Sequence, residues 1–223
     1  MTKLPFSFKV TTTDQELERM SLIAMRNFLN QKLPTVAKQA EIKIADNIKR
    51  IFIGSPAYES LVNGPLDAHF GIPKGEALPR LDAIINTMAD SVRVDTTRIT
   101  IAGNTLRGGI KVSAIKGDFT DLLVLPEAKV QTDKGQELPW LEWLLIKGDA
   151  IIISNYQITF GNYNTSRSGA ALMLKNTSKS WRVPVGVSGT ANNNWITRAV
   201  DDAYAFVDGL IASAIEDSMN RVF

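Results

Sequence analysis

Apolar residues recur every three or four positions over much of the first part of the chain, a spacing typical of helices. The first such segment follows Thr13 and Asp14, either of which can cap a helix. Its apolar positions are Leu17, Met20, Ala24 and Phe28. Because proline disfavours helical conformation in the residue before it, we expect this helix to end near Leu33.

A second helix is predicted to begin at Pro34, since proline suits the first helical position. Its apolar residues fall on one face and most of its cations fall elsewhere, which makes this the clearest amphipathic helix of the chain. The apolar positions are Ala37, Ala40, Ile44, Ile48 and Ile51. Gly54 is expected to end the helix. Two single helical turns between breakers are expected at residues 58–62 and 66–70.

A further helix is predicted from Pro79 to about Arg93, with one buried stripe. The pattern then changes from helical spacing to alternation. Residues 98–102 and 108–114 predict a β-hairpin that turns at Gly103-Asn104. Strand character continues at 122–125, and a polar tight turn is expected at residues 132–135.

A short, highly apolar helix opened by Pro139 is predicted at residues 138–146. Three strand-like runs follow it, at residues 150–153, 156–160 and 170–174. The last helix is predicted from Trp195 to about Asn220, with caps supplied by the asparagines before it.

The order of these elements predicts an α+β fold: N-terminal helices, an antiparallel β-sheet interrupted by a short helix, and a long C-terminal helix. A chain of 223 residues is most economically one domain. We therefore expect a single domain over residues 1–223, with residues 1–53 as an arm and helical extension. Residues 4–12 suit an extended arm or edge strand that reaches a neighbouring subunit, or else a packed-down terminus.

Composition narrows the classes of function. With 44% hydrophobic and 22% charged residues the chain matches an ordinary globular protein. A formal net charge of +2 is too small to indicate a polyanion as the main partner. The absence of cysteine excludes disulfides, thiolate nucleophiles and cysteine-ligated metals. No stretch has the length and apolarity of a membrane span or a secretory signal, so we expect a cytoplasmic origin and no membrane partner.

No catalytic, metal-binding or cofactor-binding constellation is found, and we expect the protein not to be an enzyme. His69 is the only histidine and has no second ligand nearby in sequence, which favours a structural or a surface histidine over a catalytic or metal-binding one. Ser113-Ala-Ile-Lys116 matches the Ser-x-x-Lys pattern of serine acylases, but it falls in a predicted strand, whereas that chemistry needs the start of a helix. We interpret it as a chance match.

Two features remain open. The helix that carries Trp140 and Trp143 is apolar almost all round, so it must be buried in the domain, which is the default, or against another chain. The loop at residues 162–169, with Arg167, is either solvated, in contact with a protein partner, or bound to nucleic acid.

Several motifs together resemble the virion proteins of tailed bacteriophages, and within that group the neck proteins of the head-to-tail connector, close to the tail-completion or tail-terminator type. The similarity covers roughly residues 40–200. The motifs are residues 45–49, 55–61 and 63–64, Leu138-Pro-Trp-Leu-Glu-Trp-Leu-Leu145, residues 152–161, Ser166-Arg-Ser-Gly169, Trp181-Arg-Val-Pro184, Gly189-Thr190 and Trp195-Ile-Thr-Arg198.

The resemblance implies a subunit that forms or completes the neck ring between portal and tail and helps to retain packaged DNA. It implies a location in the virion neck, and in the host cytoplasm during assembly. The implied partners are other copies in a homo-oligomeric ring, a portal or adaptor protein, tail tube, sheath or terminator proteins, and packaged DNA through non-specific contact. A tail-terminator ring is the alternative within this class, and a small DNA-binding protein or hydrolase is the alternative outside it.

The resemblance and the residue patterns together indicate which residues contact other subunits or partners. In a ring, each subunit uses two different faces. We expect the N-terminal arm and the helix with Trp140 and Trp143 to contribute to subunit contacts. Arg107, Lys111, Lys116 and Arg167 are the candidates for contacts with the lumen or a partner.

Overall fold

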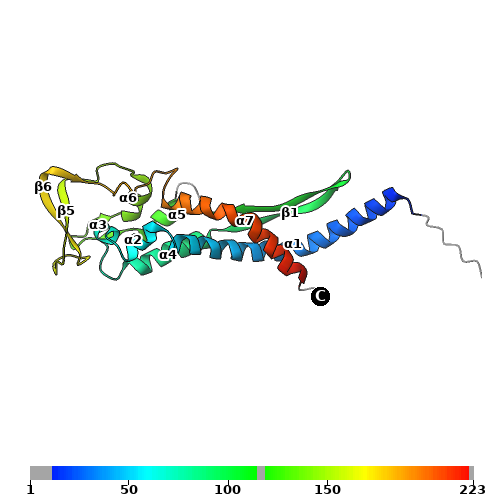
Figure 1. Cartoon of the computed structure of the whole chain (residues 1–223), viewed down its shortest axis with the longest axis horizontal. Coiled ribbons are helices and arrows are strands. Elements are labelled where there is room, and N and C mark those ends of the chain that lie inside the picture. The colour runs from blue at the N-terminus through cyan, green and yellow to red at the C-terminus, as the bar shows by residue number, and fades with distance from the viewer. Residues whose placement is uncertain (1–11, 115–118, 221–223) are drawn as a thin grey trace, which may run out of the picture.

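The structure, a computed structural model, describes residues 12–114 and 119–220, with side chains to Ser218. The molecule is elongated, with a compact end and a projecting arm (Figure 1). The helix α1 (Asp14–Ile53) extends along most of its length. At about 1.5 Å per residue, its 40 residues span about 60 Å. The extended arm predicted for residues 4–12 lies almost wholly outside the described residues.

Thr13 begins α1 through a capping box. Its hydroxyl accepts a hydrogen bond from the backbone N–H of Glu16 at 3.2 Å, and its own N–H donates to the Glu16 carboxylate at 2.9 Å. Two of the N–H groups that a helix start leaves unpaired are satisfied in this way. The prediction of a cap at this position is confirmed.

The predicted break at Leu33 is wrong, because α1 continues through Pro34. A proline inside a helix removes one backbone hydrogen bond and costs about 3 kcal/mol. Here the cost is offset by packing after the proline, where the face predicted for the second helix is buried. Ala37, Ala40, Ile44 and Ile48 of that face are buried and Ile51 is partly buried, and Val36 and Phe52 are buried beside them. Tertiary burial therefore overrides the local signal.

The compact end is built from short helices packed on the C-terminal half of α1. These are α2 (Pro56–Val62), α3 (Leu66–Phe70), α4 (Ala77–Asp90), α5 (Thr120–Leu123) and α6 (Trp140–Ile146), with a 3₁₀ turn η1 (Pro126–Ala128). The helices predicted near α2, α3, α4 and α6 are confirmed. The strand predicted at residues 122–125 is wrong, because this run forms α5 and the turn after it. A four-residue apolar run does not distinguish a strand from a helical turn.

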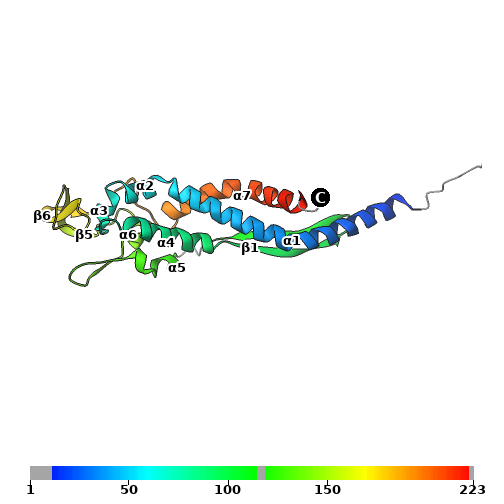
Figure 2. The same cartoon turned by 90° about the horizontal axis from the view of Figure 1, so that it is seen from below.

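The last helix, α7 (Trp195–Asn220), packs antiparallel against the C-terminal half of α1 (Figure 2). Lys43 on α1 forms an ion pair with Asp217 at 2.8 Å and donates to Ser213 at 2.7 Å. Ser218 donates to the side chain of Gln39 at 3.0 Å. These contacts place the end of α7 beside Gln39, so the first turns of α1 extend beyond it.

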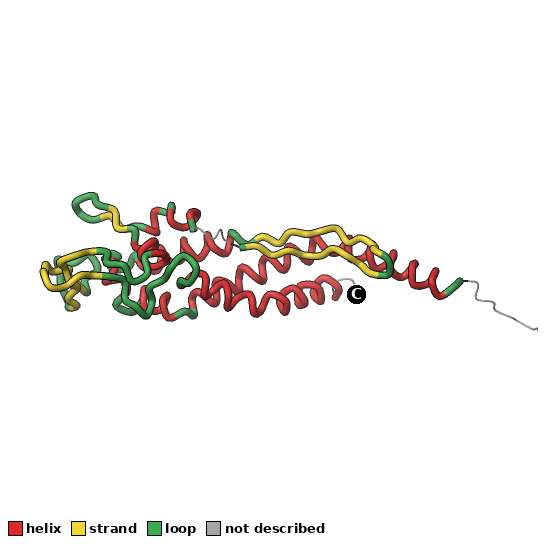
Figure 3. Tube along the Cα trace, turned by 90° about the horizontal axis from the view of Figure 1, so that it is seen from above, coloured by secondary structure: helices red, strands yellow, loops and turns green. Residues whose placement is uncertain are grey.

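The strands that the structure describes form three separate antiparallel hairpins, coloured yellow in Figure 3. They are β1 (Arg93–Ala102) with β2 (Thr105–Ser113), β3 (Val130–Gln131) with β4 (Glu137–Leu138), and β5 (Ile153–Phe160) with β6 (Ala171–Trp181). The α+β class is confirmed. Of the two strands predicted around Ser154-Asn155, the first does not form, because residues 150–152 lie outside any strand, and the second belongs to β5. The strand β5 runs through Asn155, which has a φ of 63° and lies where the pairing register shifts. A bulge thus replaces the expected interruption.

The hairpin β1–β2 lies along the N-terminal half of α1, and α1 continues past its tip (Figures 1 and 3). Asn30 on α1 both donates to the carbonyl of Ile99, at 2.9 Å, and accepts from its N–H, at 2.8 Å. Ile99 lies where the β1–β2 register shifts. A Cβ on Gly108, opposite this shift, would come within 2.7 Å of Ile99 Cα, so the close approach requires glycine.

Asn30→Ala is expected to lower the free energy of unfolding by about 1–3 kcal/mol, because it leaves both backbone groups of Ile99 without their partner. Chemical denaturation would measure the loss, and hydrogen exchange at the Ile99 amide would show where it arises. Asn30→Asp keeps the acceptor and should fall between wild type and the alanine variant. Unchanged protection of the Ile99 amide in Asn30→Ala would contradict this docking role.

Candidate partner-contact surfaces

The outward face of the β1–β2 hairpin carries the predicted contact residues Arg107 and Lys111. Pairs such as Val94 with Val112 and Ile101 with Leu106 are half-buried. The alternate positions point away from α1 and are exposed, and they include Arg107 opposite Thr100 and Lys111 opposite Asp95. The structure therefore places both cations on one exposed face, about 13 Å apart along the strand. Lys116 lies outside the described residues.

Trp140, predicted as a subunit contact, is fully buried within the chain. Its indole N–H donates to the carbonyl of Glu127 at 2.8 Å, and its ring packs on Phe70 with centroids 5.8 Å apart. A side chain with no exposed surface cannot touch another subunit, so direct contact through Trp140 is incompatible with this fold. The core alternative holds for this residue.

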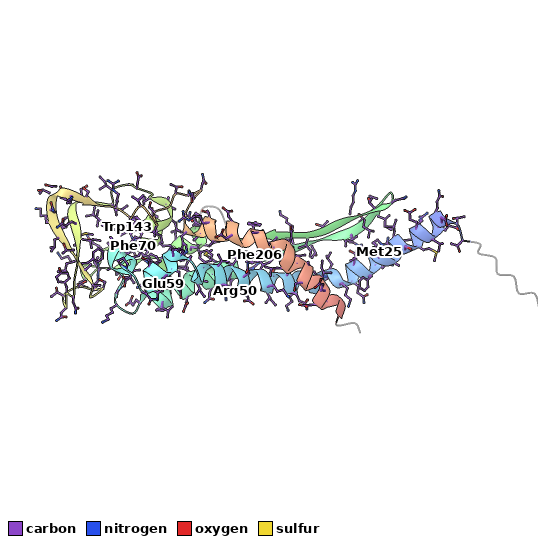
Figure 4. The ribbon with its side chains drawn as sticks, in the orientation of Figure 1. Met25, Arg50, Glu59, Phe70, Trp143 and Phe206 are labelled. Atoms are coloured by element: carbon purple, nitrogen blue, oxygen red, sulfur yellow. The ribbon has the colours of Figure 1, made fainter. Side chains whose placement is uncertain are left out.

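Trp143 is half-buried and packs edge-on against Trp181, with ring centroids 5.6 Å apart. Figure 4 shows Trp143 and Phe70 at the compact end of the molecule. Trp143 also lines an open pocket of about 530 Å³ between α3, the β3–β4 turn and the β5–β6 hairpin. Unlike Trp140, it keeps surface that a partner could reach.

Arg167, in the loop between β5 and β6, holds three segments together. Its guanidinium donates to the carbonyl of Gln131 in β3 at 3.2 Å, and its carbonyl accepts from the N–H of Lys74 at 3.1 Å. The guanidinium also lies over Gly71, where a Cβ would be 3.1 Å from one of its nitrogens. Arg167 thus has structural partners in this chain, in addition to the partial exposure that a contact residue needs.

His69 borders the same pocket and is held by aromatic neighbours. The indole N–H of Trp181 donates to its Nδ1 at 3.2 Å, and Phe160 packs on it edge-on with centroids 5.0 Å apart. Burial lowers the pKa of His69 below its usual value. The nearby hydroxyls of Ser166 and Ser168 bond to each other, and Ser166 also donates to the carbonyl of Ala171 at the start of β6. His69 is therefore in contact with aromatic side chains of its own chain.

The pKa of His69 predicts a pH dependence of stability. In the unfolded chain His69 takes up a proton near pH 6.5, whereas in the folded chain burial resists it until lower pH. The free energy of unfolding should therefore fall as the pH drops below about 6.5. His69→Gln, which does not titrate, should flatten this part of the curve in thermal or denaturant unfolding.

Asp67 acts in the opposite direction and serves as an internal check. Burial raises the pKa of its carboxyl, and this effect outweighs the hydrogen bond from the N–H of Ala68, which lowers the pKa. Its contribution to stability is therefore present at low pH and is lost as the pH rises through the folded pKa. Wild type and His69→Gln both contain Asp67. The difference between their curves of stability against pH therefore reports the titration of His69 alone. Parallel curves for the two proteins would contradict the assignment.

A surface that sequence reasoning missed lies on the first turns of α1, which we call the open face. It consists of large apolar side chains with exposed fractions of 49% for Leu17, 63% for Met20, 53% for Met25 and 37% for Phe28. Figure 4 shows Met25 on the projecting part of the helix, far from the compact end. The apolar spacing was visible in the sequence. What it could not indicate is that no element of the described chain covers this face.

Within residues 12–114 and 119–220, no group of three or more His, Asp or Glu side chains is placed to hold a metal ion. None of the helices that the structure describes is long and apolar enough to cross a membrane. Comparisons of the chain with protein-family models, curated proteins and solved structures return no match.

Proposed function

We propose that this protein is a structural subunit of a tailed-bacteriophage virion, which forms or completes the neck ring between portal and tail and helps to retain packaged DNA. Its partners in this proposal are other copies of itself in a ring, a portal or adaptor protein, and tail tube, sheath or terminator proteins. Its place is the head-to-tail junction of the virion, and the host cytoplasm during assembly. The role is one of assembly and not of catalysis.

One observation carries the assembly part of this proposal: a projecting arm with an uncovered apolar face. Contiguous exposed apolar patches on folded proteins mark interaction surfaces. The open face of Leu17, Met20, Met25 and Phe28 is such a patch, and it lies on a helix that extends past both α7 and the tip of the β1–β2 hairpin. An elongated subunit with this arm is suited to pack beside its neighbours.

The phage-neck part of the proposal rests on the resemblance of the sequence motifs. In the structure, Trp140, Trp181 and Trp195 from these motifs are buried in the core. Trp195 also donates to Ser55, which belongs to the upstream motif, at 2.8 Å. The similar motifs therefore pack together, which is the arrangement expected if the resemblance reflects a shared core.

A tail-terminator ring at the head-proximal end of the tail is the second candidate, and the same open face supports it equally. A small DNA-binding protein is the candidate of a different class. The observation that favours it is the exposed pair Arg107 and Lys111, since cations spaced along one face suit phosphate contact.

Sedimentation of the purified protein, alone and mixed with portal complex, tests the proposal. We expect ring-sized particles or co-migration with the portal. A strictly monomeric protein that ignores the portal, yet binds DNA with a steep dependence on salt, would support the DNA-binding class instead. Imaging of virions with the protein labelled then separates neck from tail. Label at the neck is the expected result, and label only at the tail tip or nowhere would overturn it.

The DNA alternative has its own matched variants. Arg107→Gln/Lys111→Gln removes two cations from the hairpin face, and Lys38→Gln/Lys49→Gln removes two from α1. If the hairpin bound DNA, the first pair should weaken binding and reduce the slope of log K against log salt by about 2 relative to the second pair. Equal behaviour of the two pairs would assign any DNA binding to net charge alone.

A further inference from the structure

The β1–β2 hairpin lies on one side of α1, and the first turns of α1 extend past its tip. Asn30 and Glu41 bind the β1–β2 hairpin on that side. On another side of the same helix, α7 ends beside Gln39. The open face therefore begins where the cover of α7 ends, and within the described residues nothing takes its place.

The open face continues along α1 in the same helical phase. Steps of three and four residues lead from Leu17 through Phe28 to Ile42, whose side chain is also exposed. Ile53, at the end of α1, is exposed as well. Along the part of α1 that precedes Gln39, the exposed apolar side chains are Leu17, Met20, Met25 and Phe28.

Charges beside the open face are unevenly distributed. The first turns carry the acids Asp14, Glu16 and Glu18, with Arg19 after them. Further along the helix, cations outnumber acids. The cations are Arg26, Lys32, Lys38, Lys43, Lys49 and Arg50, and the acids are Glu41 and Asp46. Lys43 and Glu41 already have partners in the chain, Asp217 and the N–H of Val94. Two copies placed parallel and in register would set like charges against like, whereas antiparallel or staggered copies set acids beside cations.

We infer that the open face of α1 is covered by a second copy of this chain, with the acidic first turns of one copy beside the cations at Lys32 and Lys38 of the next. Apolar contact through Met20, Met25 and Phe28 supplies the attraction, and the charges set the stagger or direction. The inference rests on the proposed function, because it names the surface through which the proposed assembly forms.

Two apolar variants with a matched control test the surface. Met20→Ser/Met25→Ser removes the most exposed side chains of the open face, and Met173→Ser/Leu174→Ser removes exposed apolar side chains from β6. Sedimentation velocity over a range of concentrations, alone and with portal complex, should show self-association of wild type and of the control. The open-face variant should associate at least 10-fold more weakly, with a helical circular dichroism spectrum like that of wild type.

Charge reversal tests the arrangement. Asp14→Lys/Glu18→Lys spares the Thr13–Glu16 capping box and should weaken self-association, as should Lys32→Glu/Lys38→Glu. A mixture of the two variants, or a variant that combines all four changes, should recover it, because acids and cations again face each other. Failure of both the mixture and the combined variant to recover association would overturn the charge pairing.

Three results would overturn the inference, and each has a different consequence for the proposed function. If Met20→Ser/Met25→Ser associates as strongly as wild type, the interface between copies lies outside the open face, and the proposal of assembly is unaffected. If the protein is a monomer, and removal of residues 1–11 lowers the protection of the α1 amides from hydrogen exchange, then the chain's own N-terminus covers the open face. Wild type that neither self-associates nor binds portal complex removes the proposed function as well.

Discussion

Trp140→Ala is expected to lower the free energy of unfolding by about 3–5 kcal/mol, the range for removing a fully buried tryptophan. The ring is completely enclosed, packs on Phe70, and donates its N–H to the carbonyl of Glu127. The substitution leaves a cavity, and the carbonyl of Glu127 keeps only its longer bond from the Arg80 guanidinium, at 3.3 Å. Denaturant unfolding, monitored by circular dichroism, measures the loss.

Two companion variants separate packing from hydrogen bonding and from assembly. Trp140→Phe keeps an aromatic ring and loses the bond to Glu127, so its loss should be smaller. Trp143→Ala should also cost less than Trp140→Ala, because Trp143 is half-exposed. If Trp140→Ala left stability unchanged and abolished self-association, Trp140 would be a subunit contact after all and the core assignment would be wrong.

Asn194→Ala should lower the free energy of unfolding by about 2–3 kcal/mol. The side chain is completely buried and caps α7: its Oδ1 accepts from the N–H groups of Ile196, at 2.9 Å, and Thr197, at 3.0 Å. Its Nδ2 donates to the carbonyl of Thr190 at 2.9 Å. Alanine leaves the two N–H groups unpaired at a buried helix start, while the carbonyl of Thr190 keeps only the N–H of Asn193, at 3.1 Å. Thermal or denaturant unfolding measures the change.

Asn194→Asp is the matched control. A carboxylate still accepts from both N–H groups and is favoured by the positive end of the helix, but it cannot donate to Thr190. We expect its stability to lie between those of wild type and Asn194→Ala. An alanine variant as stable as wild type would show that the start of α7 does not depend on this cap.

Neighbouring residues in the sequence were sufficient to predict helix caps and tight turns, because in each of these a particular residue type satisfies the backbone. The cap at Thr13, the start of α7 after the asparagines, and the turn at Gly103-Asn104 follow from such signals, and all are confirmed. The polar turn at residues 132–135 is confirmed by the bond from the N–H of Gly135 to the carbonyl of Thr132. These requirements act over a few residues, so neighbours in sequence decide them.

Local signals failed where packing reversed a preference. Pro34 predicts a break, yet burial of the following face keeps α1 continuous. Residues 122–125 are apolar enough for a strand, but the chain places α5 there, with Leu122 buried in the core. Asn155 has a φ of 63° and creates a bulge where an interruption was predicted. In each case the deciding partner is distant in sequence.

Among the candidate contact residues, some could be placed from the sequence and others only from the folded chain. The period of two along a strand is enough to place Arg107 and Lys111 on one face, once β2 is recognised. No pattern could separate Trp140 from Trp143, which lie on the same short helix, or show that Arg167 bonds to β3. Those outcomes depend on which surfaces the rest of the chain covers.

The positions of most helices, the β1–β2 hairpin and the apolar stripe on the first turns of α1 follow from the sequence, because side-chain periodicity and capping chemistry are local properties. The continuation of α1 past Pro34, the enclosure of Trp140 and the end of α7 beside Gln39 depend on tertiary packing. Burial is the sum of contacts from elements far apart in sequence. For that reason the stripe of Leu17, Met20 and Phe28 could be predicted as a helix face, while its exposure appeared only in the folded chain.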